Sequence, residues 1–371
     1  MRSLSVFSSP DPALPLNTGV AGNQPEERKR RILSALSSSS FSLPSGPPVI
    51  TLVDKPEDNL DLARAVQDSA MLLFLQSAFA RFQKEYAVMP NSHLDCFTNG
   101  GPHSFVAAFS APRQDGVQVP THGVLGQACY YAMDKETPIT ESTYPALKWD
   151  LSVTRRCVQA ILDNECKIAY ALITHPGHHA GPSSYGGFCF VNHAALAARL
   201  LQKRFPRVAV VDVDYHSGNG TMAIFYNDPS VFFASIHGDP ESDYPFNAGF
   251  SNQIGGPQAL GATFNIPLPG GSGWLEYKAA LLRVVHAVKD FGANALVVSL
   301  GLDTLRGDPV AFPRSRFNIL PEDCVEMGDI LLDSLGLPTI VVQEGGYELS
   351  LVPDAVTNFL RGSSSRKRSK I

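Results

Sequence analysis

Short apolar runs and amphipathic stretches alternate along most of the chain. The apolar runs are four to seven residues long, rich in β-branched residues, and end in polar or Gly-containing turns, which is typical of strands buried on both faces. The expected strands cover residues 49–53, 168–174, 208–213, 231–236, 262–268, 295–301 and 339–342. The expected helices cover residues 25–36, 58–88, 151–164, 192–205, 221–227, 274–291 and 321–335. Strands that alternate with helices predict an α/β fold, with a parallel sheet covered by helices on both faces.

The two ends and one internal region lack this periodicity. Residues 1–20 are rich in Ser, Pro and Gly, and we expect them to be disordered. Residues 362–371 form a basic tail, so the folded domain is expected over residues 21–361. Within it, residues 90–148 are irregular and contain many Gly, Pro, His and Asn. Long loop regions inside a compact chain are usually functional.

The apolar run at residues 208–213 ends in acid. Asp212, Asp214 and His216 occupy alternate positions, so in an extended segment their side chains point to one side. Taken singly, such an Asp is more often a helix cap and such a His a hydrogen-bonded core residue. Two carboxylates and an imidazole together at the end of a buried strand need a cation among them, because burying unpaired charge is costly. Oxygen and nitrogen ligands of this kind suit zinc or a similar ion.

Polar residues follow four further predicted strands. They are His178 with His179, Ser235 with His237, Asp303, and Tyr347. Because the carboxyl ends of parallel strands meet at one edge of a sheet, this arrangement is typical of an active site.

Asp214, His216 and Asp303 would supply three metal ligands and leave one position open, which is the pattern of catalytic zinc. The histidine pair suggests a general base and an electrostatic partner, with Asp212 and Asn219 as supports for one imidazole each. Tyr347, after Glu-Gly-Gly, could stabilise a developing oxyanion. Together these groups predict metal-assisted hydrolysis of an amide.

Composition narrows the alternatives. The chain has 371 residues, is 44% hydrophobic and 18% charged, and carries a formal net charge of -5, which gives no case for nucleic-acid binding. The six cysteines contain no Cys-x-x-Cys pair, which favours a reduced intracellular protein. No apolar run predicts a membrane span or a secretory signal. A serine nucleophile elbow and a Walker-type phosphate loop are also missing from the sequence.

Six motifs in this order resemble the zinc-dependent histone deacetylase and acetylpolyamine amidohydrolase superfamily. They are His175-Pro-Gly-His-His-Ala180, Gly187-Phe-Cys-Phe-Val-Asn192, Asp212-Val-Asp-Tyr-His-Ser-Gly-Asn-Gly-Thr221, Ser235-Ile-His-Gly-Asp-Pro240, Leu300-Gly-Leu-Asp-Thr304 with Asp308-Pro309, and Glu344-Gly-Gly-Tyr347. The resemblance covers about residues 20–362 and implies an arginase-like fold with a parallel sheet of about eight strands. It makes residues 21–361 a deacetylase domain.

The resemblance also implies a role for each site residue. Asp214, His216 and Asp303 would bind one zinc ion, His179 would act as general base and acid, and His178 as its electrostatic partner. Tyr347 would stabilise the oxyanion. A potassium ion would lie behind the zinc, held by Asp212, by Ser235 and by backbone carbonyls. Phe188 and Tyr244 would form walls of the substrate channel, and the Gly187 carbonyl would accept a hydrogen bond from the substrate.

Within the superfamily the sequence is most similar to acetylpolyamine amidohydrolases. The similarity lies in Tyr244-Pro-Phe246 and in Ala132-Met-Asp-Lys-Glu-Thr-Pro-Ile139. In that group the latter segment belongs to a loop that narrows the channel and builds a homodimer. Ser217, in place of a second His after the metal ligand, and Gly181-Pro182 depart from the family pattern.

The predicted function is therefore removal of acetyl groups from small acetylated amines such as acetylpolyamines, by hydrolysis of a linear amide. The alternative is a protein lysine deacetylase, which would use the same catalytic residues. A two-manganese ureohydrolase and a catalytically silent binding protein are weaker alternatives. No nucleic-acid or membrane partner is expected, and a homodimer remains open. The cytoplasm is the expected compartment, while Arg366-Lys-Arg368 and Ser369-Lys-Ile371 leave the nucleus and the peroxisome open.

Overall fold

Eight parallel strands form the centre of the molecule. The structure is a computed structural model, and it describes residues 2–10, 23–43, 46–57, 59–87, 104–108, 123–312 and 314–363. The order of strands across the sheet is β2-β1-β5-β10-β9-β6-β7-β8, and every neighbouring pair is parallel. The strands are β1 (Arg2–Ser8), β2 (Val49–Leu52), β5 (Cys166–Leu172), β6 (Val208–Asp212), β7 (Val231–Gly238), β8 (Thr263–Leu268), β9 (Ala295–Leu300) and β10 (Thr339–Gln343). The predicted fold class is confirmed.

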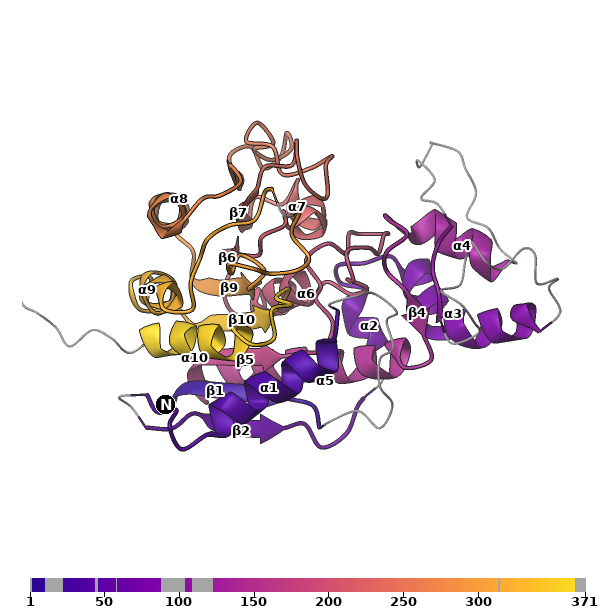
Figure 1. The fold of residues 1–371 in the computed structure, drawn as a ribbon, viewed down its shortest axis with the longest axis horizontal. Coiled ribbons are helices and arrows are strands. Elements are labelled where there is room, and N and C mark those ends of the chain that lie inside the picture. The colour runs from indigo at the N-terminus through magenta and orange to yellow at the C-terminus, as the bar shows by residue number, and fades with distance from the viewer. Residues whose placement is uncertain are drawn as a thin grey trace, which may run out of the picture.

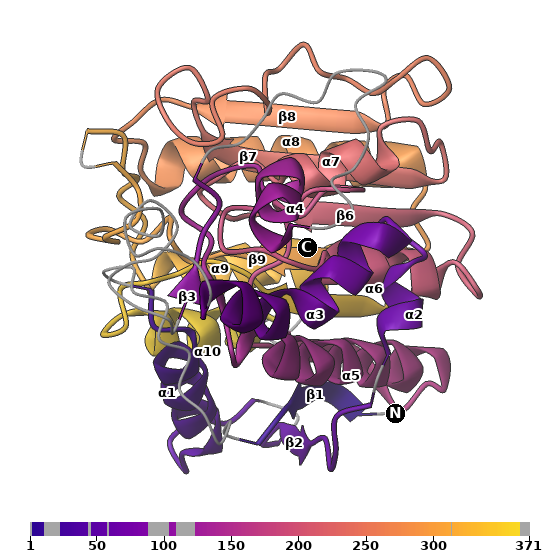
Figure 2. The same ribbon diagram turned by 90° about the vertical axis from the view of Figure 1, so that its right-hand side faces the viewer.

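Helices cover both faces of the sheet (Figure 1). One face carries α1 (Pro25–Ser37), α8 (Trp274–Phe291), α9 (Asp323–Gly328), the π-helical turn Asp329–Asp333 and α10 (Val352–Gly362). The other face, which is turned to the viewer in Figure 2, carries α2 (Leu60–Ala63), α3 (Ser69–Tyr86), α4 (Val124–Tyr131), α5 (Thr143–Leu162), α6 (His193–Leu201) and α7 (Asn219–Phe225). A two-stranded sheet, β3 (Ser104–Phe105) and β4 (Ile139–Thr140), packs near α3.

Alternate residues of each central strand contribute to two separate cores. In β6, Val208 and Val210 belong to the core under α5 and α6, whereas Ala209 and Val211 belong to the core under α8 and α10. All five residues of β6 are buried. A strand that is covered on both faces needs apolar residues at successive positions, which is why these strands are recognisable as continuous apolar runs.

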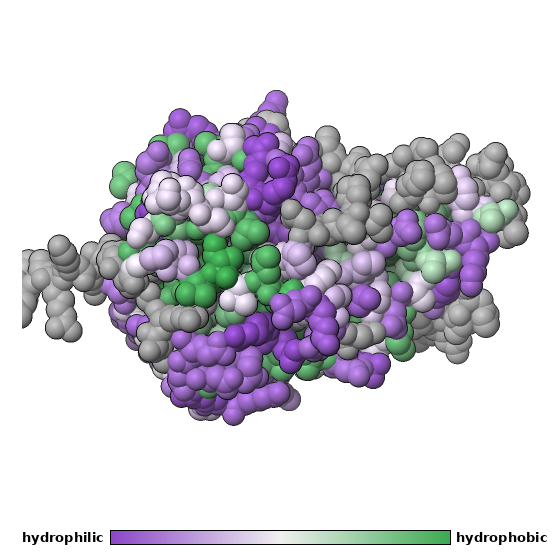
Figure 3. Space-filling view, turned by 90° about the horizontal axis from the view of Figure 1, so that it is seen from below, coloured by the Kyte–Doolittle hydropathy of each residue, from purple (hydrophilic) through white to green (hydrophobic). Residues whose placement is uncertain are grey.

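The edge strand β2 is less completely covered. Its residues are half-buried, and Leu52 is 46% exposed. Figure 3 shows apolar residues gathered in the middle of the face seen from below, which is where Figure 1 places β2. In the part of the chain that the structure describes, no helix is both long enough and apolar enough to span a membrane.

The expectation of disorder over residues 1–20 is wrong for residues 2–8. These residues form β1, which pairs with β2 on one side and β5 on the other. Leu4, Val6 and Phe7 are at most 2% exposed. Residues 2–8 contain a short alternation of apolar residues among several serines. The strand that they form is stabilised by pairing with strands that are distant in the sequence. Residues 11–22 and the basic tail from 364 onward lie outside the described residues, and the boundaries of the folded domain stay a prediction.

Two further expectations need correction. The region from 90 to 148 is not wholly irregular, because it contains α4 and the start of α5, and α5 begins eight residues earlier than expected, at Thr143 rather than residue 151. The expected helix over 321–335 is interrupted, since α9 passes into a π-helical turn at Asp329. The other expected strands and helices are confirmed, with differences of a few residues at their ends.

A substitution in β1 tests whether this strand belongs to the core. We expect Phe7→Ala to lower the free energy of unfolding by about 3–5 kcal/mol, because it leaves a cavity in a buried cluster. The measurement is the urea midpoint of the purified variant. Leu275→Ala, at a side chain that is 77% exposed, is the control and should change stability by less than about 0.5 kcal/mol. An unchanged midpoint for Phe7→Ala would contradict the placement of β1.

Candidate active site and metal centre

The predicted site residues meet at one edge of the sheet. They follow the carboxyl ends of β5, β10, β9, β6 and β7, which are five consecutive neighbours in the sheet. Ligand atoms of Asp214, His216 and Asp303 lie within 4.8 Å of one another, and all three residues are buried. The edge where parallel strands end is the usual ligand site of such sheets, because backbone N–H groups and loops converge there.

Backbone N–H groups hold the two carboxylates in place. Tyr215 donates to Asp303 Oδ1 at 2.8 Å, and Gly345 donates to Asp214 Oδ2 at 2.9 Å. A Cβ atom at Gly301 would lie 2.0 Å from Asp214 Oδ2. Glycine is therefore required at this position, since any side chain would displace the carboxylate.

The charges of this cluster fit a divalent cation. Burial and the neighbouring Asp214 raise the pKa of Asp303 to about 7. His216 Nδ1 lies 2.9 Å from Asp303 Oδ2 and 3.3 Å from Asp214 Oδ1. Burial lowers the pKa of His216, but its hydrogen bonds to the two carboxylates outweigh burial and raise it well above its usual value. Nδ1 is therefore the nitrogen that faces the two carboxylates, and the three ligand atoms surround one space that would suit a cation.

The two adjacent histidines have different partners and different charge. His178 Nδ1 donates to Asp212 Oδ2 at 2.9 Å, and His179 Nδ1 donates to Asn219 Oδ1 at 2.6 Å. Burial lowers the pKa of His178, but the charges of Asp214 and Asp212 outweigh burial and raise it to about 10. Burial and the charge of His178 lower the pKa of His179 well below its usual value. These surroundings favour the protonated form of His178 and the neutral form of His179, in which Nε2 is free to accept a proton.

The loop that carries these histidines is held by two buried acids that the sequence analysis did not single out. Glu344 Oε2 accepts from Gly177 N at 2.6 Å and from His178 N at 3.2 Å. Asp150, on α5, accepts from Thr174 N at 2.8 Å and from His175 N at 3.1 Å. In the sequence, Glu344 stands out only as part of the Glu-Gly-Gly-Tyr motif, and no pattern around Asp150 indicates that it supports the histidine loop.

Ser235 lies directly beside Asp212, its register partner in the β6–β7 pair. The Ser235 hydroxyl is 2.7 Å from His237 Nδ1. Because His237 Nε2 contacts the Gly249 carbonyl at 2.8 Å, it carries the proton there, and Nδ1 accepts from Ser235. The lone pairs of the Ser235 oxygen therefore remain available to a ligand.

A cavity of about 410 Å³ leads to the cluster. Gly187, Phe188, Tyr244 and Tyr347 line it together with the histidine pair and the three candidate ligands. The rings of Phe188 and Tyr347 meet edge to face with centroids 5.9 Å apart, and the Tyr244 ring lies edge-on to His179 at 4.9 Å. The three residues predicted to bind substrate are thus brought to one channel above the cluster.

Tyr347 is oriented by groups on two elements. Asp308 Oδ2 accepts its backbone N–H at 2.7 Å. The Arg28 guanidinium lies over its ring, 5.6 Å from the centroid, and donates to the Thr174 carbonyl at 3.0 Å. Arg28 is 2% exposed. The burial of Arg28 could not be predicted from the sequence, because Arg28 lies in the charged run Glu-Glu-Arg-Lys-Arg-Arg, which has the composition of a solvated helix face.

Comparison with known proteins agrees with this geometry. The family model described as histone deacetylase domain matches residues 25–363. The chain is 38% identical to acetylpolyamine amidohydrolase 1 of Pseudomonas aeruginosa over 82% of each chain. It is 34% identical to histone deacetylase 8 of Arabidopsis thaliana over 64% of each chain.

A crystal structure of acetylpolyamine aminohydrolase from Burkholderia pseudomallei superposes with a TM-score of 0.81. It has 30% sequence identity, and the match covers 98% of this chain and 99% of that one. The matched region contains every site residue described above. Since the family model spans the sheet, the histidine pair, the candidate ligands and Tyr347, the chain belongs to the histone deacetylase family.

Proposed function

We propose that this protein is a metal-dependent amidohydrolase that removes the acetyl group from small acetylated amines, with acetylpolyamines as the substrate class. The observation that carries the proposal is a buried cluster of three metal ligands at the end of an acidic channel between aromatic walls. Relatives named acetylpolyamine amidohydrolases match the chain over most of its length, which supports the same substrate class.

Asp214, His216 and Asp303 would hold zinc. Two carboxylates and one imidazole leave a position open, which is the ligand pattern of catalytic zinc. Zinc supplies Lewis-acid polarisation of the acetyl carbonyl and lowers the pKa of water. The backbone N–H groups of Tyr215 and Gly345 keep the carboxylates in the geometry required. Asp212 and Ser235 would hold potassium, as the family resemblance implies.

The protein groups divide the proton transfers between them. His179 is neutral and its Nδ1–H is engaged by Asn219, so its Nε2 accepts the proton of the attacking water and then donates it to the leaving amine. His178 keeps its proton and stabilises negative charge. The Tyr347 hydroxyl donates to the oxyanion that develops on the acetyl carbonyl. The Gly187 carbonyl accepts from the N–H of the substrate amide.

The charge of the channel favours an amine substrate. The described residues that line the channel include Asp134, Glu136 and Asp243, and they include no Lys or Arg. A free ammonium group at the distal end of an acetylated diamine would therefore be attracted into the channel. A protein lysine deacetylase would share the catalytic residues. An acetyl-lysine peptide, however, does not in general carry a positive charge that this acidic channel would attract.

The remaining expectations stay predictions. They are the folded domain over residues 21–361 with a basic tail from 362 to 371, a homodimer, and the cytoplasm as the compartment with the nucleus and peroxisome as alternatives. The tail motifs from residue 366 onward lie outside the described residues.

The preference of the enzyme between two acetylated substrates tests the proposed substrate class. We expect kcat/KM of the zinc-loaded protein for acetylputrescine to exceed that for an acetyl-lysine peptide by at least about tenfold, the size of one hydrogen bond to a charged group. Tyr347→Phe should lower kcat for either substrate by about 100- to 1,000-fold, because it removes an oxyanion donor. A preference for the peptide would make the protein a lysine deacetylase instead.

The second prediction concerns the metal. The wild-type protein should bind one zinc ion, and Asp303→Asn should weaken zinc binding by more than about 100-fold, since even residues that only support a ligand contribute 10- to 100-fold. Competition with a chromophoric chelator measures both affinities. Glu136→Gln, at an exposed acid of the same channel, is the matched control and should leave zinc affinity unchanged. Equal affinities of Asp303→Asn and wild type would exclude this site.

The third prediction concerns pH. Because His179 must be neutral and its pKa is lowered from the ordinary 6.5, kcat/KM should stay high as the pH falls to 6.5 and decline only below it. Zinc, as a cation, would lower that pKa further, so the direction holds for the loaded enzyme. The hydrogen bond to Asn219 raises the pKa of His179, so Asn219→Ala should move the decline to still lower pH.

The same Asn219→Ala variant should lose about 10- to 100-fold in kcat, because the imidazole loses its orientation. Both effects come from one pH profile of kcat/KM and kcat. A decline that begins above pH 6.5, or that moves upward in Asn219→Ala, would contradict the assignment of His179 as the neutral base.

A further inference from the structure

We infer that Asp134 is a positioning residue that ties the two aromatic walls of the channel together, fixes the channel width and thereby selects slender substrates. The inference rests on the proposed function and adds a specificity determinant to it. Asp134 lies between α4 and β4 and lines the substrate channel. It is not one of the three candidate metal ligands.

The Asp134 carboxylate accepts four hydrogen bonds. Its Oδ1 accepts from Glu136 N at 2.9 Å and from Thr137 Oγ1 at 3.0 Å, both within its own turn. Its Oδ2 accepts from Gly187 N at 2.5 Å and from the Tyr244 hydroxyl at 2.8 Å. One oxygen atom therefore joins the loop after β5 to the loop after β7, which form different sides of the channel.

The Phe188 wall has a backbone conformation that needs this support. Gly187 has a φ of 57° and Phe188 a φ of 65°, and a non-glycine residue seldom adopts a left-handed conformation. Asp134 accepts the N–H of Gly187, and Thr137 Oγ1 accepts the N–H of Phe188 at 3.0 Å. The turn at 134–137 thus holds two successive amides of the wall.

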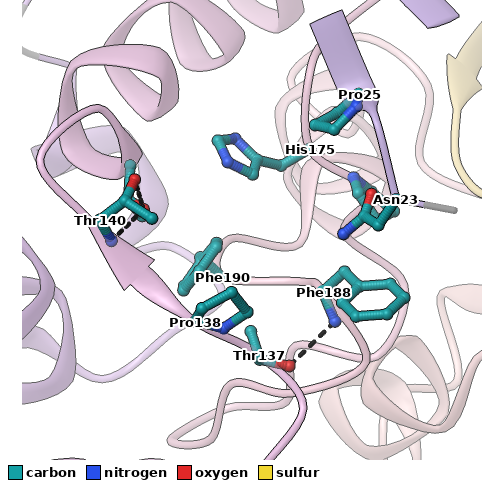
Figure 4. Close-up of a pocket in the computed structure, with 10 residues that line it drawn as sticks. Asn23, Pro25, Thr137, Pro138, Thr140, His175, Phe188 and Phe190 are labelled. Atoms are coloured by element: carbon teal, nitrogen blue, oxygen red, sulfur yellow. Dashed lines mark hydrogen bonds between the residues drawn. The ribbon is translucent and has the colours of Figure 1, made fainter. Parts of the chain in front are cut away.

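The backbone of Phe188 is held close to Thr137. Figure 4 shows the hydrogen bond from the Phe188 N–H to Thr137, while the Phe188 ring points away from Pro138 and Phe190. The cavity among these residues is only about 20 Å³, which is about the space of one water molecule. The turn that carries Thr137 is therefore packed closely against the Phe188 backbone.

The Tyr244 wall is held at its hydroxyl end. Its ring packs edge-on to His179 with centroids 4.9 Å apart, and its hydroxyl reaches Asp134. If this hydrogen bond were lost, the loop could move outward and the channel would widen at its entrance. A methylene chain would fit between walls held in this way, whereas a bulkier group, such as a peptide backbone at the entrance or a branch next to the acyl group, would require the walls to separate.

A purely electrostatic role for Asp134 predicts a different outcome. The exposed acid Glu136 lines the same channel and would attract an ammonium group without linking the walls. Tyr244→Phe separates the two roles, because it removes the hydrogen bond across the channel but keeps the Asp134 charge and the aromatic ring. If substrate selectivity falls when the Tyr244 hydroxyl is removed while the Asp134 charge is kept, the hydrogen bond between Tyr244 and Asp134 controls selectivity, and the inference is supported.

The test is a double-mutant cycle with Tyr244→Phe, Asp134→Asn and the combination of the two. For each protein we would measure the ratio of kcat/KM for acetylputrescine to kcat/KM for an acetyl-lysine peptide. Tyr244→Phe should lower this ratio by about tenfold, the size of one lost hydrogen bond to a charged group. Asp134→Asn should lower it by at least the same factor, because it breaks the same hydrogen bond and also removes a negative charge from the channel. The double variant should give the same ratio as Asp134→Asn alone, because both changes break one link.

Glu136→Gln is the matched control for the carboxylate. It should lower kcat/KM for acetylputrescine through lost charge, and Tyr244→Phe should still lower the ratio by about tenfold in the Glu136→Gln background. A double variant of Asp134 and Tyr244 whose ratio lies about tenfold below that of Asp134→Asn alone would mean that the residues act independently, and would overturn the inference. So would an unchanged ratio in Tyr244→Phe.

A binding experiment keeps this test independent of the substrate. The probes are a straight-chain alkyl hydroxamate and a hydroxamate with a phenyl ring on the carbon next to the hydroxamate group, titrated calorimetrically into zinc-loaded protein. Tyr244→Phe should improve the affinity of the branched probe relative to the straight one by about tenfold. If the wild-type protein hydrolyses neither acetylated substrate, the proposed function fails. The ratio of the affinities for the branched and the straight hydroxamate still decides whether the hydrogen bond between Tyr244 and Asp134 sets the width of the channel.

Discussion

The repulsion between Asp214 and Asp303 is the constraint on which the rest of the site depends. Burial, and the charge of the adjacent Asp214, raise the pKa of Asp303 to about 7. Such a pair is stable only when a cation lies between its members. The glycines at 301 and 345, the backbone N–H groups and the imidazole of His216 are all arranged around that space.

The parallel sheet explains why so much charge can be buried in one place. The central strands β6, β9 and β10 are apolar along most of their length, and the charged residues of the site lie at or beyond their carboxyl ends. At that edge the backbone groups are no longer engaged in the sheet and can donate to carboxylates, as Tyr215 and Gly177 do. The same residues in the middle of a strand would have no donors, and their burial would oppose folding.

Much of this could be predicted from the sequence, because the signals are local. Alternation of Asp212, Asp214 and His216 is visible within five residues, and the apolar runs reveal the central strands. The features that the sequence does not reveal depend on distant partners. β1 is stabilised by β2 and β5, and the carboxylate of Asp134 finds two of its donors 53 and 110 residues away. Arg28 looks like a surface residue until α1 packs over Tyr347.

The division between strand ends and loops also separates chemistry from selectivity. The candidate metal ligands and the histidine pair are fixed by the sheet and by buried acids, so they tolerate little change. The channel walls belong to loops that are joined by a few hydrogen bonds, and those can be altered without moving the cluster. The separation is incomplete, because Tyr244 packs on His179. A wall that moves outward also removes a contact from the imidazole, so a change in substrate width should carry some cost in the proton transfer that follows.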